Sequence, residues 1–260
     1  MVVNLLKIPF DTNLLDYNIK YHKELDSTNK YIKGLEISEK DEGLVIVAER
    51  QLEGRGRKGN DWYSPAGTGL YFSILLRPNF SIEDLSRINM IISLALYNVL
   101  KRDYPVKMKW PNDIYLVDKK IAGILIESNI EGDLIKEVII GVGCNTNQKS
   151  FPDGLNKKAG SLFLYNGEAV DNKRFLIDIL IEFDRLYSEF IIDRIDYIEK
   201  WKERLGIIGQ EIKVKSDRDV IEGEVADIDV QGNLILEKMN GDRLVVSSGE
   251  VSVIEGGYRS

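Results

Sequence analysis

The sequence predicts an α+β protein with two domains, residues 1–206 and residues 207–260. Three observations lead to this prediction. Up to Gly206, apolar runs of strand length alternate with amphipathic helical segments. Beyond Ile207, short alternating strands follow one another between polar or glycine-containing turns, which is typical of a small β-barrel. The total length of 260 residues suits one large domain with a small companion.

The composition narrows the classes of function. The chain has 35 basic and 42 acidic residues and a net charge of −7, whereas nucleic-acid binders are usually basic. A single cysteine, Cys144, excludes an intrachain disulfide and any cysteine-rich metal site, and a single histidine, His22, excludes mechanisms that need two imidazoles. No apolar run approaches the ~20 residues that span a bilayer. The N-terminus does not resemble a signal peptide, so we expect a cytoplasmic protein that binds neither DNA nor membranes.

The first half of the chain is predicted to alternate between strands and helices. The first twenty residues show no clear periodicity and are expected to form an edge strand or an irregular lead-in. A helix is expected to begin within Asp26–Asn29, where all four residues are good N-caps. Continuous apolar runs predict buried strands at Leu44–Ala48 and Leu70–Leu76. The following helix is expected over residues 81–101, with Ser81 as its N-cap.

The second half is predicted to continue the sheet and then change character. Strands are expected over residues 106–110, 114–117, 121–127 and 134–142, followed by a long loop. Asp171 is expected to cap a long amphipathic helix, and a second helix should end at Gly206. The strands of the small domain are expected over residues 211–214, 223–228, 234–237, 243–246 and 251–254.

A glycine-rich segment, Gly54–Gly59, matches the pattern G-x-G-x-x-G. A dinucleotide-binding fold would need a helix directly after it, and the following Asn60–Pro65 cannot begin one. What remains is a flexible loop that carries Arg55, Arg57 and Lys58 in an acidic protein. Such a loop suits phosphate or carboxylate oxygens, although an ordinary solvated loop with chance arginines fits the pattern equally well.

Three further segments are candidates for chemistry. Asn112 and Asp113 follow a strand and could offer oxygens to magnesium or a ribose, although an ordinary strand end is the commoner meaning. Lys120 enters an otherwise apolar strand, either as a turn residue or as a charge aimed at a buried carboxylate. Two glycines in Gly141–Asn145 indicate close approach of the backbone to another group. Within this segment, Cys144 is expected to be a core residue and not a nucleophile.

Together these motifs resemble biotin–protein ligases in their order and spacing. The resemblance rests on Ser27-Thr28-Asn29, Gln51 with Gly54–Gly59 and Trp62, Lys109–Asp113, Lys120-x-x-Gly123-x-Leu125-x-Glu127, and Gly141-x-Gly143-x-Asn145. It implies a catalytic domain built on a mixed sheet of the class II synthetase-like type, followed by an SH3-like barrel. It also implies ATP-dependent conversion of biotin to biotinyl-5′-AMP and transfer of biotin to a lysine of a biotin carboxyl carrier protein domain, with release of AMP and pyrophosphate.

The resemblance also implies roles for individual residues. The catalytic residues would be Lys120, which bridges the biotin carboxylate and the α-phosphate, and Arg55 and Arg57, which fold over the adenylate. The ligand-binding residues would be Ser27, Thr28, Asn29 and Gln51 at the biotin ring; Gly54, Arg55, Gly56 and Arg57 in the loop; Trp62 at the adenine; and Asn112, Asp113, Lys120, Gly123 and Asn145. Mg²⁺ would be held by Asp113.

Two departures from the family pattern carry information. The catalytic motifs begin at Ser27, which leaves no room for the N-terminal DNA-binding domain of the bifunctional members, so we expect a monofunctional ligase. Asn60 stands where a third loop arginine is common.

Three functions other than biotin ligation remain compatible with the sequence. They are a lipoate–protein ligase, which shares this fold and chemistry, a non-catalytic sensor of biotin or its adenylate, and a structural interaction module. A homodimer formed through a sheet edge is also expected. Turns of the C-terminal domain such as Ser247–Glu250 are expected to lie within reach of the active site.

Overall fold

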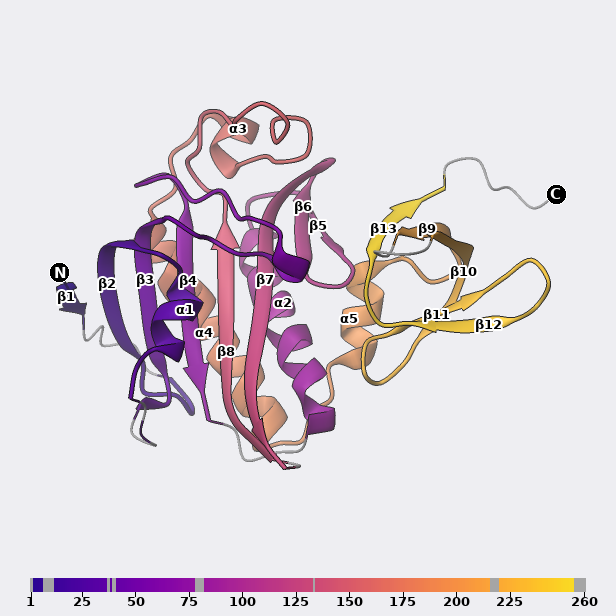
Figure 1. Cartoon of the computed structure of the whole chain (residues 1–260), viewed down its shortest axis with the longest axis horizontal. Helices are drawn as coiled ribbons and strands as arrows, with labels where there is room; N and C mark the ends of the chain where they lie inside the picture. Colours follow the sequence, from indigo (N-terminus) through magenta and orange to yellow (C-terminus); the bar gives the residue numbers. More distant parts are fainter. Residues whose placement is uncertain are drawn as a thin grey trace.

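The computed structural model describes residues 2–6, 12–36, 38, 41–77, 82–132, 134–215 and 220–254. It contains one eight-stranded sheet and one five-stranded sheet (Figure 1). The large sheet has the order β1-β2-β3-β4-β8-β7-β6-β5, in which β2 and β3 are parallel and the other neighbours are antiparallel. The predicted α+β class with a mixed sheet is therefore confirmed.

The elements have the following bounds. The large sheet consists of β1 Val2–Leu6, β2 Asn18–Leu25, β3 Leu44–Gln51, β4 Leu70–Leu76, β5 Val106–Lys109, β6 Asp113–Leu116, β7 Lys119–Glu131 and β8 Leu134–Cys144. The helices are α1 Thr28–Lys33, α2 Leu85–Leu100, α3 Leu162–Asn166, α4 Asn172–Ile191 and α5 Ile198–Leu205, with short 3₁₀ turns η2 Arg57–Gly59 and η3 Ile82–Asp84. The small sheet consists of β9 Glu211–Lys215, β10 Val220–Ile228, β11 Leu234–Glu237, β12 Arg243–Val246 and β13 Glu250–Val253.

Capping residues set two helix ends where the sequence predicts them. Asp171 accepts hydrogen bonds from the backbone N–H groups of Lys173 and Arg174 and so begins α4. Gly206 ends α5 in the left-handed region at φ 60°, where glycine has no steric penalty. The α-helix α2 begins only at Leu85, after a 3₁₀ turn, and the predicted cap Ser81 lies outside the described residues.

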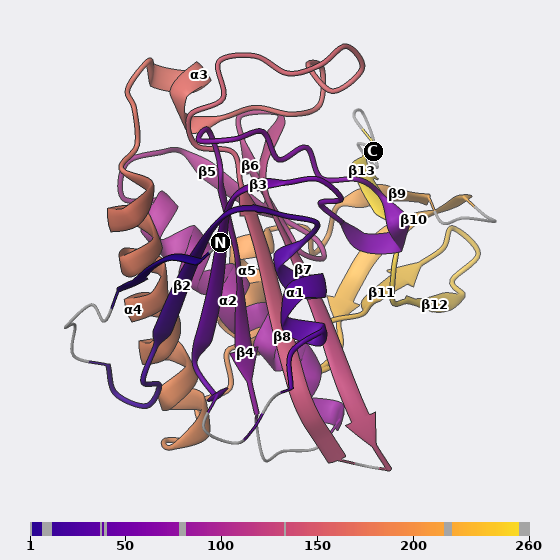
Figure 2. The ribbon, with the colours of Figure 1, turned by 60° about the vertical axis from the view of Figure 1, so that its left-hand side comes forward.

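Two elements were not predicted. Strand β2 buries only Ile19 and His22 along its length, so its apolar alternation is too weak to see in the sequence. Helix α3 has five residues and interrupts the predicted loop between β8 and α4. This segment forms one end of the large domain (Figures 1 and 2).

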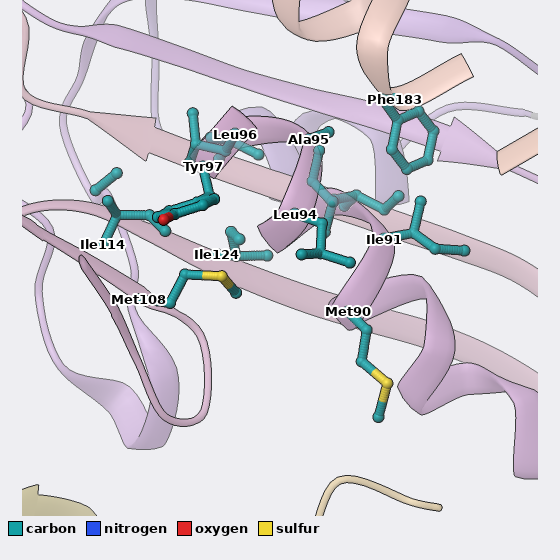
Figure 3. Close-up of a cluster of buried hydrophobic side chains, with 14 of the residues drawn as sticks. Met90, Ile91, Leu94, Ala95, Leu96, Tyr97, Met108, Ile114, Ile124 and Phe183 are labelled. Atoms are coloured by element: carbon teal, nitrogen blue, oxygen red, sulfur yellow. The ribbon is translucent and has the colours of Figure 1, made fainter. Parts of the chain in front are cut away.

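The central strands β3 and β4 are buried on both faces of the sheet, and successive residues along each strand point to opposite faces. Val45 and Val47 belong to the main core, which α2 and α4 cover on one side. Figure 3 shows the centre of this core, where α2 residues such as Leu94 pack between the sheet and Phe183 of α4. Leu44 and Ile46 point to the opposite face, where a smaller cluster packs under α1. Helix α1 leaves the rest of this second face uncovered (Figures 1 and 2), and the candidate site lies there.

The small sheet packs against the large domain next to α5 (Figure 1). One contact between the two domains is a hydrogen bond of 2.8 Å from the Trp110 indole N–H to the Gly232 carbonyl oxygen. Gly232 has φ 81°, and the ring of Trp201 in α5 lies beside it. Among the helices of the described residues, none combines the length and the apolar character that crossing a bilayer requires.

Candidate active site

A cavity of about 770 Å³ lies on the face of the large sheet that carries α1. Its floor is made of glycines because the β7–β8 register places Gly123 opposite Gly143 and Leu125 opposite Gly141. A Cβ atom on Gly143 would lie 2.4 Å from the Trp62 indole nitrogen, and one on Gly141 would lie 2.4 Å from Asn29 Oδ1. These two glycines therefore allow a loop side chain and a helix side chain to reach the strand backbone, as the sequence predicts.

All but one of the residues predicted for the site line this cavity: Ser27, Thr28, Asn29, Gln51, Arg55, Gly56, Arg57, Trp62, Asn112, Asp113, Lys120, Gly123 and Asn145. The exception is Gly54, which lies behind the lining. A Cβ atom there would meet the Trp62 carbonyl oxygen at 2.5 Å and Ser64 Oγ at 2.7 Å. Gly54 therefore shapes the loop and does not face the cavity.

One end of the cavity is neutral and densely hydrogen-bonded. Gln51 Oε1 accepts from the Thr28 backbone N–H at 2.9 Å and lies 3.2 Å from Thr28 Oγ1. Gln51 Nε2 donates to Ser64 Oγ at 3.1 Å. Ser73 Oγ lies 2.6 Å from Thr28 Oγ1 and 2.5 Å from Asn29 Oδ1. This end can bind a compact polar group that both donates and accepts hydrogen bonds.

The other end is charged. Lys120 Nζ lies 2.7 Å from Asp113 Oδ1 and 5.3 Å from the centre of a Trp62 ring. Burial raises the pKa of Asp113, while the adjacent Lys120 opposes this rise. Burial likewise lowers the pKa of Arg57, and Asp113 opposes that change. A carboxylate or phosphate entering here would meet the partly buried cations of Lys120 and Arg57, and partial burial strengthens each contact.

The glycine-rich loop folds as a tight hairpin over this charged end. The Trp62 N–H donates to the Gly54 carbonyl at 2.8 Å, and the Gly56 N–H donates to the Asn60 carbonyl at 2.6 Å. Lys58 at the tip has φ 56°, and no α-helix follows, which agrees with the predicted exclusion of a dinucleotide fold. Arg57 Nη1 donates to Asn112 Oδ1 at 3.3 Å, whereas the Arg55 side chain is 62% exposed.

Several lining residues were not predicted. Behind the lining, Ser73 of β4 contacts Thr28 and Asn29 and was also not predicted, although a serine in an apolar strand was the available signal. Lys109 and Tyr115 come from β5 and β6, and the lysine Nζ lies 4.6 Å from the centre of the tyrosine ring. The segment after β8 adds Phe151, Leu155, Lys158 and Ala159, and the small domain adds Lys215 and Val251. Gly249 and Glu250 also line the cavity, as expected for the turn at Ser247–Glu250. Only tertiary structure brings these segments together.

The remaining candidate residues lie elsewhere or pack in the core. Cys144 is fully buried, and burial raises the pKa of its thiol to about 12, which agrees with the predicted core role. His22 is buried with its ring centre 4.6 Å from that of Tyr31. Within the described part of the chain, no group of three or more histidine, cysteine, aspartate or glutamate side chains could hold a metal ion by itself. Asp113 could supply one carboxylate oxygen to Mg²⁺, an ion that commonly takes its other ligands from water and phosphate.

Comparison with known proteins agrees with this geometry. Residues 21–145 match the model of the biotin/lipoate A/B protein ligase family, and residues 207–253 match that of the biotin protein ligase C-terminal domain. The bifunctional ligase/repressor BirA of Bacillus subtilis is 30% identical over 248 residues, which cover 94% of this chain and 76% of the relative. The biotin–[acetyl-CoA-carboxylase] ligase of Paracoccus denitrificans is 30% identical over 218 residues, which cover 79% of this chain and 88% of the relative.

Solved structures show the same relationship. A biotin protein ligase from Aquifex aeolicus, in complex with biotin and ATP, superposes with a TM-score of 0.76 at 30% identity, covering 91% of this chain and 98% of that one. The sequence match, the shared fold and the matching C-terminal domain lead to one conclusion. The chain belongs to the biotin/lipoate protein ligase family and, with its C-terminal domain, to the biotin protein ligases.

Proposed function

We propose that the chain activates biotin with ATP and transfers it to a lysine of a biotin carboxyl carrier protein domain. The observation that carries this proposal is that the two ends of this one cavity differ in charge. Its neutral end offers donors and acceptors from Thr28 and Gln51, and its charged end offers Lys120 and Arg57. Biotin has the same polarity, with a neutral ureido ring at one end and a carboxylate at the other. The relatives named for biotin ligation support the proposal.

In the first step, a carboxylate oxygen of biotin attacks the α-phosphorus of ATP. A new O–P bond forms and the bond to the β-phosphate oxygen breaks, which releases pyrophosphate and leaves biotinyl-5′-AMP. Negative charge accumulates on the α-phosphate oxygens as the bond order changes. We propose that Lys120 contacts both the carboxylate and these oxygens, and the 2.7 Å contact of its ammonium nitrogen with Asp113 supports this role.

The loop arginines and Asp113 complete the charged end. Arg57 is held over the cavity by Asn112, and we propose that both loop arginines fold onto the α-phosphate and the carboxylate. The adenine is proposed to lie against Trp62, whose ring already packs on Gly143. When bound at Asp113, Mg²⁺ would neutralise phosphate charge. The other proposed residues act by positioning and by excluding water.

In the second step, the ε-amine of a carrier lysine attacks the acyl carbon of the adenylate. The C–N bond forms, the bond to AMP breaks, and the amine loses a proton as AMP leaves. No covalent enzyme intermediate is needed, which agrees with the burial of the single cysteine. The carrier would enter beside the small domain, whose Lys215 and Glu250 lie at the cavity wall. A homodimer paired through edge strand β1 or β5 stays a prediction, and light scattering can check the dimeric state. A cytoplasmic location also stays a prediction.

The test measures pyrophosphate release from ATP and Mg²⁺ with biotin, lipoate or octanoate supplied in turn. Of the three acids, we expect only biotin to support pyrophosphate release. We also expect biotin to be transferred to a carrier domain that retains its acceptor lysine. A carrier with that lysine changed to arginine is the matched control. Release with lipoate or octanoate but not with biotin would assign the chain to the lipoate side of its family. Biotin binding without pyrophosphate release would indicate a sensor.

A further inference from the structure

Four side chains form a continuous hydrogen-bonded path from the surface to the neutral end of the cavity. The path runs from Glu127 on β7 through Asn29 on α1 and Ser73 on β4 to Thr28. Ser73 is fully buried, Thr28 and Asn29 are almost so, and the Glu127 side chain is 32% exposed. Each link offers a limited number of protons, so the direction of every hydrogen bond can be worked out.

The first link fixes the amide of Asn29. Lys33 Nζ lies 2.6 Å from one oxygen of Glu127, and Asn29 Nδ2 lies 2.8 Å from the other. Burial alone would raise the pKa of Glu127, but the hydrogen bonds from Lys33 and Asn29 hold it below its ordinary value. An ionised carboxylate only accepts, so the Asn29 amide must turn its NH₂ group toward Glu127. Its oxygen then faces Ser73.

The second link uses the one proton of Ser73. Asn29 Oδ1 can only accept, so the contact of 2.5 Å requires Ser73 to donate to it. Ser73 then has no proton for its contact of 2.6 Å with Thr28, and Thr28 must donate to Ser73 there. The protons of both hydroxyl groups are therefore directed away from the cavity.

The third link gives the cavity its chemical preference. With its proton on Ser73, Thr28 Oγ1 presents only lone pairs to a ligand. The nearby Gln51 Oε1 is also an acceptor, because its amide nitrogen donates to Ser64 Oγ. The Thr28 hydroxyl could also donate to Gln51 Oε1, but that contact is 3.2 Å and the contact with Ser73 Oγ is 2.6 Å, so we assign the proton to the bond with Ser73. A ligand N–H group suits this pair of oxygens, and a ligand oxygen does not.

We propose that Glu127, Asn29 and Ser73 are positioning residues that fix Thr28 as a hydrogen-bond acceptor and thereby select a ligand with an N–H group at this end. Both polar atoms of Asn29 are engaged within the protein, so Asn29 acts through Thr28 and does not hold the ligand itself. The inference rests on the proposed function, because the ureido N–H of biotin is the group selected. The dithiolane of lipoate and the alkyl chain of octanoate offer no N–H and would leave Thr28 unpaired.

The test compares biotin with its two cyclic carbamate analogues, in each of which one ureido N–H is replaced by oxygen. Binding of each to the full-length protein is measured by calorimetry. The protein should bind one analogue, whose oxygen faces Thr28, about a hundredfold more weakly than biotin, because two acceptors then oppose each other. In Ser73→Ala and Glu127→Gln, Thr28 can turn its proton to the ligand. The ratio of the dissociation constant of this analogue to that of biotin should then fall about tenfold.

Three comparisons separate positioning from structural damage. A structural defect would weaken all ligands together and leave the ratio unchanged. Ser73→Thr keeps the hydroxyl group and should restore the ratio, and Ser93→Ala removes another buried hydroxyl, on α2, without effect on it. Glu127→Gln tests the same path at a partly exposed residue, should Ser73→Ala fail to fold. If the wild-type protein and the variants all bound biotin and their ratios of dissociation constants, analogue over biotin, agreed within about twofold, this inference alone would be overturned. Absence of biotin binding would overturn the proposed function as well.

Discussion

The two ends of the cavity are built on different physical principles. At the neutral end, Thr28, Asn29 and Ser73 are buried, and their hydrogen bonds lie within the protein. At the charged end, Arg55 is largely exposed, and Lys120 and Asp113 form an ion pair that a ligand phosphate can rearrange. Buried hydrogen-bonded networks give a fixed pattern of donors and acceptors, whereas partly exposed charges exchange partners readily.

The difference suggests a division of labour between recognition and chemistry. A rigid neutral end can distinguish ligands before any reaction, because a mismatched donor or acceptor is left unpaired in a dry site. A charged end whose groups change partners can follow the redistribution of charge during phosphoryl transfer. Variants should therefore affect biotin affinity at one end and the rate of adenylation at the other.

The largest effect is expected for Lys120→Ala. Loss of a charge-assisted contact to the developing phosphate charge should slow single-turnover adenylation about a hundredfold, the equivalent of ~3 kcal/mol. Biotin affinity should fall less, because the Lys120 ammonium group stabilises the ground-state carboxylate less than it stabilises the developing phosphate charge. Lys119→Ala is the matched control, since that side chain reaches the Asn156 carbonyl and not the cavity. An unchanged single-turnover rate would exclude Lys120 from the mechanism.

A smaller effect should separate the two ends through the glycines of β8. In Gly141→Ala the new methyl group displaces Asn29, and in Gly143→Ala it displaces Trp62. Crowding of this kind costs ~1–3 kcal/mol, so we expect about a tenfold rise in KM for biotin in the first variant and for ATP in the second.

Steady-state kinetics with each substrate varied in turn provides the measurement. Gly34→Ala is the control, because a Cβ atom there has its closest neighbour at 3.6 Å. If both variants raised the KM for biotin and the KM for ATP equally, the two ends would not act independently, and the proposed division between recognition and chemistry would be wrong.

The smallest effect is expected at the glycine-rich loop. Trypsin should cleave the free protein faster after Arg55 than after Arg57, because Arg57 is partly buried and bonded to Asn112. Biotin with ATP should slow both cleavages about fivefold, the equivalent of ~1 kcal/mol of added local stability. Exposed Arg194, between α4 and α5, serves as an internal control whose cleavage should not change. Equal rates with and without ligands would show that the loop is preformed.

Sequence reasoning located the charged end better than the neutral end. Arg57, Asp113 and Lys120 stand out because charged residues interrupt glycine-rich or apolar segments, and a charge in such a place needs a reason. Thr28 and Gln51 could be placed only through resemblance to a family. Ser73 was missed, although it is the one polar residue in β4, because a serine in a strand has many ordinary explanations.

The sequence by itself determined the order of strands and helices apart from β2 and α3, the change to a small all-β domain after Gly206 and the family to which the chain belongs. These features depend on local periodicity, capping and motif spacing, which are readable along the chain. Only the tertiary structure decided that Gly143 lies under Trp62, that Ser73 links Thr28 to Asn29 and that Lys215 reaches the cavity. Strand register and domain packing set these contacts between residues far apart in sequence, and no local pattern encodes which distant neighbour a side chain meets.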